Sequence, residues 1–353
     1  MKPISQEKKA ALLDGLVIPA HPLALNSGRQ LDERRQRALS RYYIASGAGG
    51  FAVGVHSTQF EIRDKQYNLY EPVLRLAAEE VKKAKISHPF IQVAGICGPT
   101  QQAMIEAELA ASLGYDAGLV SMGGLQDYTE WQLLQRIEKI TGIIPVIGFY
   151  LQPSVGGKVF SFDFWKEFAA IPGVEAIKMA PFNRYQTIDV VRAVCHSSRR
   201  DEIALYTGND DNIVNDLLTT YRFTINGEVI EKKIVGGLLG HWAVWTHKAV
   251  QLLEEIKLVR GKTSLATEWL TRNVAITDSN AAFFDPAHQF AGCIPGLHEV
   301  LHRQGLLEGR WCLNPHEELS LGQMEEINRV YRDYPSLNDD EFVAKHLAEW
   351  LAD

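Results

Sequence analysis

The chain has 353 residues, of which 46% are hydrophobic and 22% are charged, as in ordinary soluble globular proteins. This length allows one large domain or two ordinary ones, with a sizeable core. The formal charge of −7 argues against a nucleic-acid surface, which requires a basic face. No apolar run approaches the roughly 18 residues of a membrane span, and the polar N-terminal stretch has no apolar core of signal-peptide length. We therefore expect a cytoplasmic protein without nucleic-acid or membrane partners.

The cysteines follow no pattern of a metal or redox site. Cys97, Cys195, Cys293 and Cys312 form no CxxC pair and no Cys/His spacing typical of zinc. Disulfides belong to oxidising compartments, so we expect four reduced, mostly structural thiols.

Apolar, β-rich stretches alternate with helical patterns along most of the chain. The expected strands lie within residues 15–25, 49–57, 88–97, 115–122, 143–153, 174–181, 202–210 and 233–242. A helical pattern follows each of them, which predicts an α/β protein with a (β/α)8 TIM barrel. The strands are almost wholly apolar, as strands covered on both faces should be. A doubly wound open sheet has the same rhythm, but no GxGxxG fingerprint follows the first strand.

The barrel is expected to occupy residues 1–260. Residues 221–233 alternate in polarity around Asn226-Gly227, which predicts a small hairpin inserted before the eighth strand. Residues 261–353 show helical patterns only and predict a C-terminal helical extension. No Gly/Ser-rich linker precedes this extension, so we expect it to pack on the barrel.

In such barrels the active site lies at the C-terminal ends of the strands. The polar residues at these ends are therefore the candidates. They are His21, His56, Ser57, Thr58, Ser121, Tyr150, Gln152, Lys178, Thr207, Asn209, Asp210 and His241.

Lys178 is the most informative of these residues, because it lies within the apolar run "GVEAIKMAPF". A buried amine is costly unless it is paired or its pKa falls. A neutral amine attacks a ketone to form a Schiff base, which is one use of a buried lysine. The alternative is a salt bridge to Glu175 or Asp210, and position alone does not decide between the two.

Tyr150 ends the fifth expected strand, and Lys178 lies on the sixth. Sequential barrel strands are neighbours, so we expect the Tyr150 hydroxyl to lie near the amine and to relay protons there. The alternative is a core tyrosine bonded to a backbone carbonyl.

Together these residues resemble a known family. The pair "FYLQPS…GVEAIK" is similar to the "YNxPxxT…K" pattern of the dihydrodipicolinate synthase / N-acetylneuraminate lyase family of class I aldolases. The separation of tyrosine and lysine, 178 − 150 = 28, is the one expected for that family. "VGVHSTQFEI" falls where the family has its "GTTGE" loop, and "LYTGND" resembles the segment after its seventh strand. The resemblance spans roughly residues 13–260.

The resemblance implies a role for each matched residue. Lys178 would form an imine with a 2-keto acid, typically pyruvate, and Tyr150 would relay protons. His56 and Ser57 would hold the substrate carboxylate, largely through backbone N–H groups. Gly208 would let its loop approach the substrate, with Asn209 also at the substrate. The family also implies a homodimer or homotetramer.

Three departures from the family pattern argue against dihydrodipicolinate synthase activity. Val55-His56 stands in place of the family's threonine pair, so Val55 cannot relay a proton. Gly124 lies near the place of the synthase's second tyrosine, and Val155 replaces its substrate-binding arginine. His56 is a candidate to replace the threonine as acid or base.

The sequence thus predicts a Schiff-base lyase, an aldolase or dehydratase, that acts on pyruvate or a keto-deoxy sugar acid without metal or other cofactor. A keto-acid-binding barrel without turnover is the second reading. A metal-dependent class II aldolase is the third, and it would require His21, His56 and His241 to converge.

Overall fold

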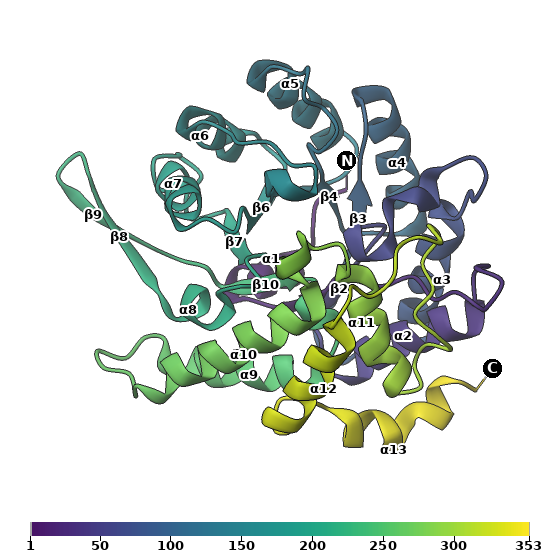
Figure 1. The fold of residues 1–353 in the computed structure, drawn as a ribbon. Helices are drawn as coiled ribbons and strands as arrows, with labels where there is room; N and C mark the ends of the chain where they lie inside the picture. Colours follow the sequence, from purple (N-terminus) through teal and green to yellow (C-terminus); the bar gives the residue numbers. More distant parts are fainter. Residues whose placement is uncertain (1, 353) are drawn as a thin grey trace.

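The computed structural model describes residues 2–352, and its centre is a parallel barrel surrounded by helices (Figure 1). Its strands are β1 (Val17–Pro19), β2 (Gly50–Val53), β3 (Ile91–Ile96), β4 (Ala117–Val120), β5 (Val146–Leu151), β6 (Val174–Ala180), β7 (Ala204–Thr207) and β10 (Gly236–Leu239). Neighbouring strands pair in chain order, and β1 pairs with β10. A parallel bridge from Ala20 to Ala52 joins the end of β1 to β2 and closes the ring. The predicted (β/α)8 barrel is confirmed.

A layer of helices covers the outside of the barrel. They are α2 (Glu33–Ala45), α3 (Tyr70–Lys83), α4 (Thr100–Leu113), α5 (Glu130–Thr141), α6 (Phe162–Ala170), α7 (Arg184–Cys195), α8 (Ile213–Leu218) and α9 (Thr246–Val259). Each buries an apolar face against the strands, as α3 does with Val73, Leu74 and Ala77. Between α8 and β10, β8 (Thr220–Ile225) and β9 (Glu228–Lys233) form an antiparallel hairpin that projects from the barrel (Figure 1).

The pairing of β5 with β6 contains an irregularity that decides which side chains enter the barrel. Val146 pairs with Val174, but Ile147 pairs with Ala176, so Glu175 is an extra residue on β6. Beyond this bulge, Lys178 pairs with Phe149, and the next residue pair is Tyr150 with Met179. Because side chains alternate across a strand, a register change of one residue exchanges the inward and outward sets.

The N-terminal end of the barrel is covered by α1 (Gln6–Asp14), a helix that the sequence analysis did not predict. Leu12 is fully buried and belongs to the apolar cluster inside the barrel. The Tyr206 hydroxyl donates to the Leu12 carbonyl oxygen at 2.9 Å and accepts from the Leu16 N–H. Lys8 pairs with Asp116 at 2.7 Å, and Lys9 pairs with Glu175.

The C-terminal helices lie against the barrel layer and share its hydrophobic core. They are α10 (Glu268–Phe284), α11 (Cys293–Arg303), α12 (Gln323–Asp333) and α13 (Asp340–Trp350). The helix α10 packs against α8, α11 and α12, and α13 packs against α2, below which it lies in Figure 1. Within residues 2–352, no helix is both long and apolar enough to cross a bilayer.

Candidate active site

Lys178 lies on the inner face of β6 at the C-terminal end of the barrel, and only 8% of its surface is exposed. Its Nζ lies 4.3 Å from the centroid of the Phe149 ring, which provides a cation–π contact. Glu175, one expected partner, lies earlier on β6 and pairs with Lys9 instead. Burial lowers the pKa of the Lys178 amine to about 8, because the charged form is poorly solvated.

Asp210 follows β7 and lines the same pocket as Lys178. Its Oδ1 accepts a hydrogen bond from the backbone N–H of His241 at 2.8 Å. Burial raises the pKa of this carboxyl to about 7, against the opposing effects of that N–H and of the Lys178 charge. The two groups oppose the effect of burial on each other, because the Asp210 charge raises the pKa of the Lys178 amine and the Lys178 charge lowers the pKa of the Asp210 carboxyl.

The loop after β2 contributes His56 and Ser57 to the pocket, as the 3-10 turn η1 (His56–Thr58). The Ser57 hydroxyl donates to the Ala20 carbonyl oxygen at 2.9 Å. Thr58 holds the turn, since its Oγ1 accepts from the N–H groups of Gly54 and Val55. The apolar surroundings and the positive charge of Lys178 lower the pKa of the half-buried His56 ring, which favours the neutral imidazole.

Gly208 allows the loop after β7 to approach Lys178. A Cβ atom at this position would lie 2.6 Å from the Lys178 Cε and 2.9 Å from the Ala180 Cβ. Both distances are too short for a side chain, so only glycine leaves room for the lysine in this conformation. The structure brings together six of the predicted residues, namely Lys178, His56, Ser57, Gln152, Gly208 and Asp210.

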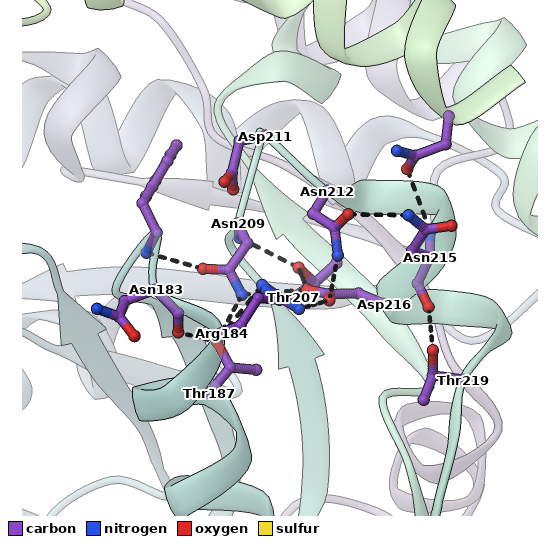
Figure 2. Close-up of polar contacts among 12 residues, drawn as sticks. Asn183, Arg184, Thr187, Thr207, Asn209, Asp211, Asn212, Asn215, Asp216 and Thr219 are labelled. Carbon is purple, nitrogen blue, oxygen red and sulfur yellow. Dashed lines mark hydrogen bonds and ion pairs between the residues drawn. The ribbon is translucent and has the colours of Figure 1, made fainter. Parts of the chain in front are cut away.

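Asn209 does not reach the pocket. Its Oδ1 accepts from the Phe182 N–H, and its Nδ2 donates to Thr187 and Asp216, as Figure 2 shows for the side chains around Thr207. Asp216 is fully buried and is also held by Thr207 and Arg184. This network ties the loop after β6 to the loop after β7, so Asn209 positions the neighbours of the pocket instead of lining it.

Tyr150 lies on the outer face of β5, and the expected meeting with Lys178 does not occur. Its ring packs between Phe160 and Trp165, with centroids at 5.8 and 5.1 Å, in the layer between strands and helices. Its buried hydroxyl faces the Phe160 backbone without a hydrogen bond of normal geometry. The cause is the bulge at Glu175, which brings Phe149 opposite the lysine.

The three histidines of the metal-dependent reading do not converge. His21 is fully buried and bonds to Ser40 and to the Pro22 carbonyl oxygen, toward α2. His241 stacks on Phe283 from α10, whereas His56 lines the pocket. Within residues 2–352, no three His, Cys, Asp or Glu side chains are placed to hold a metal ion.

The pocket around Lys178 has a volume of about 70 Å³, which holds roughly five water molecules. Most of its lining is apolar. The apolar side chains come from the strands and their loops and from the C-terminal extension: Ala20, Val55, Phe149, Leu151, Val155, Ala180, Phe182, Phe284, Phe290, Cys293 and Leu297. The part played by the extension was not predicted, because helical patterns show no contact between distant segments. Asp210 was expected both as a candidate at a strand end and as a possible partner of Lys178.

No protein-family model matches the chain, and no curated protein matches its sequence. Solved structures do match its fold. N-acetylneuraminate lyase from Fusobacterium nucleatum superposes with a TM-score of 0.70 at 16% identity, covering 92% of this chain and 99% of the lyase. Dihydrodipicolinate synthase from Oceanobacillus iheyensis gives 0.70 at 16% identity, over 91% of this chain and 96% of the synthase. CdNal from Clostridium difficile in complex with mannosamine gives 0.71 at 16% identity, over 91% and 99%. The chain therefore shares the fold of these enzymes.

Proposed function

We propose that the protein is a Schiff-base-forming lyase, a divergent member of the dihydrodipicolinate synthase / N-acetylneuraminate lyase family, that acts on a 2-keto acid through Lys178. One observation carries the proposal. An amine with a pKa of about 8 lies inside the C-terminal mouth of the barrel, over an aromatic ring. A structure of the Fusobacterium lyase complexed with pyruvate has the same fold. That likeness supports the keto-acid assignment.

The pair of Lys178 and Asp210 supplies the groups that imine formation needs. The neutral amine adds to the keto carbon, and the resulting carbinolamine must lose water. Asp210, with a pKa of about 7, carries a proton for the departing hydroxyl at neutral pH and takes one back in a later step. The Phe149 ring stabilises the protonated imine, whose positive charge replaces that of the ammonium.

The protonated imine withdraws electrons from the neighbouring carbon, so a carbon–carbon bond or a carbon–oxygen bond at the next position can break. The backbone N–H groups of His56 and Ser57 are the first two of the turn η1, and they donate to no backbone carbonyl within residues 2–352. Both can therefore donate hydrogen bonds to the substrate carboxylate. His56 is a second acceptor for a proton at the reacting carbon. Tyr150 has no part in this scheme.

A keto-acid-binding barrel without turnover is the second candidate. The observation that favours it is the lack of a free hydroxyl among the described lining residues, because Ser57 donates to Ala20 and Tyr150 faces away. In that case Lys178 would still form an imine, but no bond in the substrate would break.

The test has two stages. The protein is incubated with pyruvate and borohydride, and peptide mass spectrometry locates the reduced adduct. The adduct is expected on Lys178 in the natural sequence, and the Lys178→Met variant is expected to carry none. Water loss or aldehyde release from a panel of longer keto acids then separates the lyase from the binding protein. An adduct elsewhere, or none with any keto acid, would contradict both candidates.

A further inference from the structure

The wall of the pocket beyond Lys178 is made of hydrocarbon side chains from two distant parts of the chain. The barrel contributes Phe149, Leu151 and Phe182, and the C-terminal extension contributes Phe290 and Leu297. Phe182 and Phe290 meet edge to face, with ring centroids 5.7 Å apart and an interplanar angle of 68°. An aromatic pair therefore forms part of the wall of the pocket that holds Lys178.

The segment that carries Phe290 is held in place by buried polar contacts. The Asp285 carboxylate accepts from the Gly292 N–H at 3.1 Å and from the Ser320 hydroxyl. The Gln323 amide donates to the Gly292 carbonyl oxygen at 2.9 Å. These bonds join the end of α10 to the starts of α11 and α12, so the extension presents a defined apolar surface to the barrel.

Most polar side chains that line the pocket already interact with other groups of the protein. Ser57 donates to Ala20, and Asp210 accepts from His241 while it faces the charge of Lys178. Gln152 and the His56 ring remain for a substrate. A substrate substituent with several hydroxyl groups would lose its hydrogen bonds to water in this pocket and would find few partners to replace them. Each hydrogen bond lost in this way costs about tenfold or more in affinity.

We infer that the substrate is a 2-keto acid whose substituent is a hydrocarbon, aliphatic or aromatic, apart from the single hydroxyl group that aldol cleavage or water loss requires, instead of a polyhydroxylated chain. Phe182, Phe290 and Leu297 are the residues that determine this specificity. The inference rests on the proposed function, because Lys178 and the neighbouring loop hold the keto-acid end. The Phe182–Phe290 pair and Leu297 line the same pocket as Lys178, so a substituent on the bound keto acid meets hydrocarbon side chains there.

The test compares two keto acids with equal numbers of carbon atoms. Calorimetry measures the dissociation constants of α-ketoisocaproate, whose substituent is a hydrocarbon, and of ketodeoxygluconate, whose chain carries hydroxyl groups. α-Ketoisocaproate is expected to bind at least tenfold more tightly. Equal binding of the two, or tighter binding of ketodeoxygluconate, would overturn the inference.

A variant then tests whether the extension determines this preference. Phe290→Asn suits the backbone, because φ is 68° at Phe290 and asparagine tolerates positive φ. This variant is expected to lose roughly tenfold of the preference while pyruvate binding changes less than twofold. Leu321→Asn is the matched control, since Leu321 is 96% exposed on the same extension, and it should leave the preference unchanged. An unchanged preference in Phe290→Asn would overturn the role of the extension.

Pyruvate trapping by borohydride separates the two proposals. An adduct on Lys178 together with tighter binding of ketodeoxygluconate leaves the lyase standing and overturns the inference about the substituent. Absence of an adduct together with tighter binding of α-ketoisocaproate overturns the imine and supports an apolar keto-acid site. Absence of both the adduct and the binding overturns both proposals.

Discussion

Lysine side chains at the two ends of the barrel have different partners. At the N-terminal end, Lys8 and Lys9 on α1 pair with Asp116 and Glu175. At the C-terminal end, Lys178 rests over the Phe149 ring, and its pKa falls. The paired amines hold α1 against the barrel, whereas burial makes the neutral form of Lys178 more accessible as a nucleophile. The difference follows the rule that barrels place stability at one end and chemistry at the other.

The tyrosines at the two ends of the barrel differ in the hydrogen bonding of their hydroxyl groups. Tyr206 faces into the barrel near α1, and its hydroxyl makes two hydrogen bonds. Tyr150 faces away from the pocket, and its hydroxyl makes none of normal geometry. A hydroxyl near the C-terminal end of the barrel therefore faces away from the candidate site, so position along a strand alone does not identify a residue of that site.

The largest effect is expected from replacing the lysines themselves. Lys178→Met should abolish the borohydride adduct with pyruvate and reduce turnover to background, because residues 2–352 place no other amine in the pocket lining. Lys9→Met is the matched change at the other end. It should keep the adduct and lower the free energy of unfolding by up to about 1 kcal/mol, the usual contribution of a partly exposed ion pair. Loss of the adduct in Lys9→Met would contradict the assignment of a structural role to Lys9 and of imine formation to Lys178.

Asp210→Asn should slow imine formation and, with it, turnover. Loss of the proton carrier for the departing hydroxyl is expected to slow both roughly 10²- to 10⁴-fold, although prolonged incubation with pyruvate and borohydride should still give the adduct on Lys178. The Asp210 charge raises the pKa of Lys178 against the effect of burial, so its removal should lower that pKa. The rate of adduct formation, measured from pH 6 to pH 9, should therefore reach half of its maximum at a lower pH than the value near 8 expected for the natural sequence. A shift to higher pH would exclude this coupling.

Gly208→Ala should disturb Lys178 without removing it. The new Cβ would lie 2.6 Å from the Lys178 Cε, so the lysine must move, and a displacement of about 1 Å is expected to slow adduct formation about 10²-fold. Gly261→Ala is the control, because a Cβ there meets nothing within 4 Å. Equal rates in the two variants would show that Lys178 does not depend on the close approach of this loop.

The smallest effects are expected from the two tyrosines. Tyr206→Phe leaves the Leu12 carbonyl and the Leu16 N–H without a partner, which should lower the free energy of unfolding by about 1–3 kcal/mol. Tyr150→Phe removes a hydroxyl without a normal partner, so stability should change by less than about 1 kcal/mol and turnover should stay unchanged. Chemical denaturation and steady-state kinetics measure both. A large loss of turnover in Tyr150→Phe would restore the proton relay that the sequence predicted.

The barrel was predictable because its signal is local. Each apolar strand and each amphipathic helix has its own period, and eight such units in order define the architecture. The burial of Lys178 in the pocket was predictable for a related reason, since a charged residue inside an apolar strand can be recognised from the local sequence alone. The helix α1 was missed because its residues Gln6–Asp14 are mostly polar, and its stability comes from contacts with the barrel.

The partner of Lys178 was not predictable from spacing. A separation of 28 residues places Tyr150 opposite the lysine only if β5 and β6 pair without interruption. The extra residue Glu175 changes the register by one, and nothing in the local sequence marks that bulge. The pocket walls from the C-terminal extension were missed because their contacts join segments more than a hundred residues apart in the chain.

The most direct test of the account is the distribution of the pyruvate adduct over all lysines. The protein is trapped with pyruvate and borohydride at pH 8, and peptide mapping measures the modified fraction of Lys178 and of Lys8 and Lys9. The account predicts modification of Lys178 and none of the two amines at the N-terminal end. Modification of Lys8 or Lys9 without Lys178, or equal modification of the three, would contradict the assignment of chemistry to the C-terminal mouth.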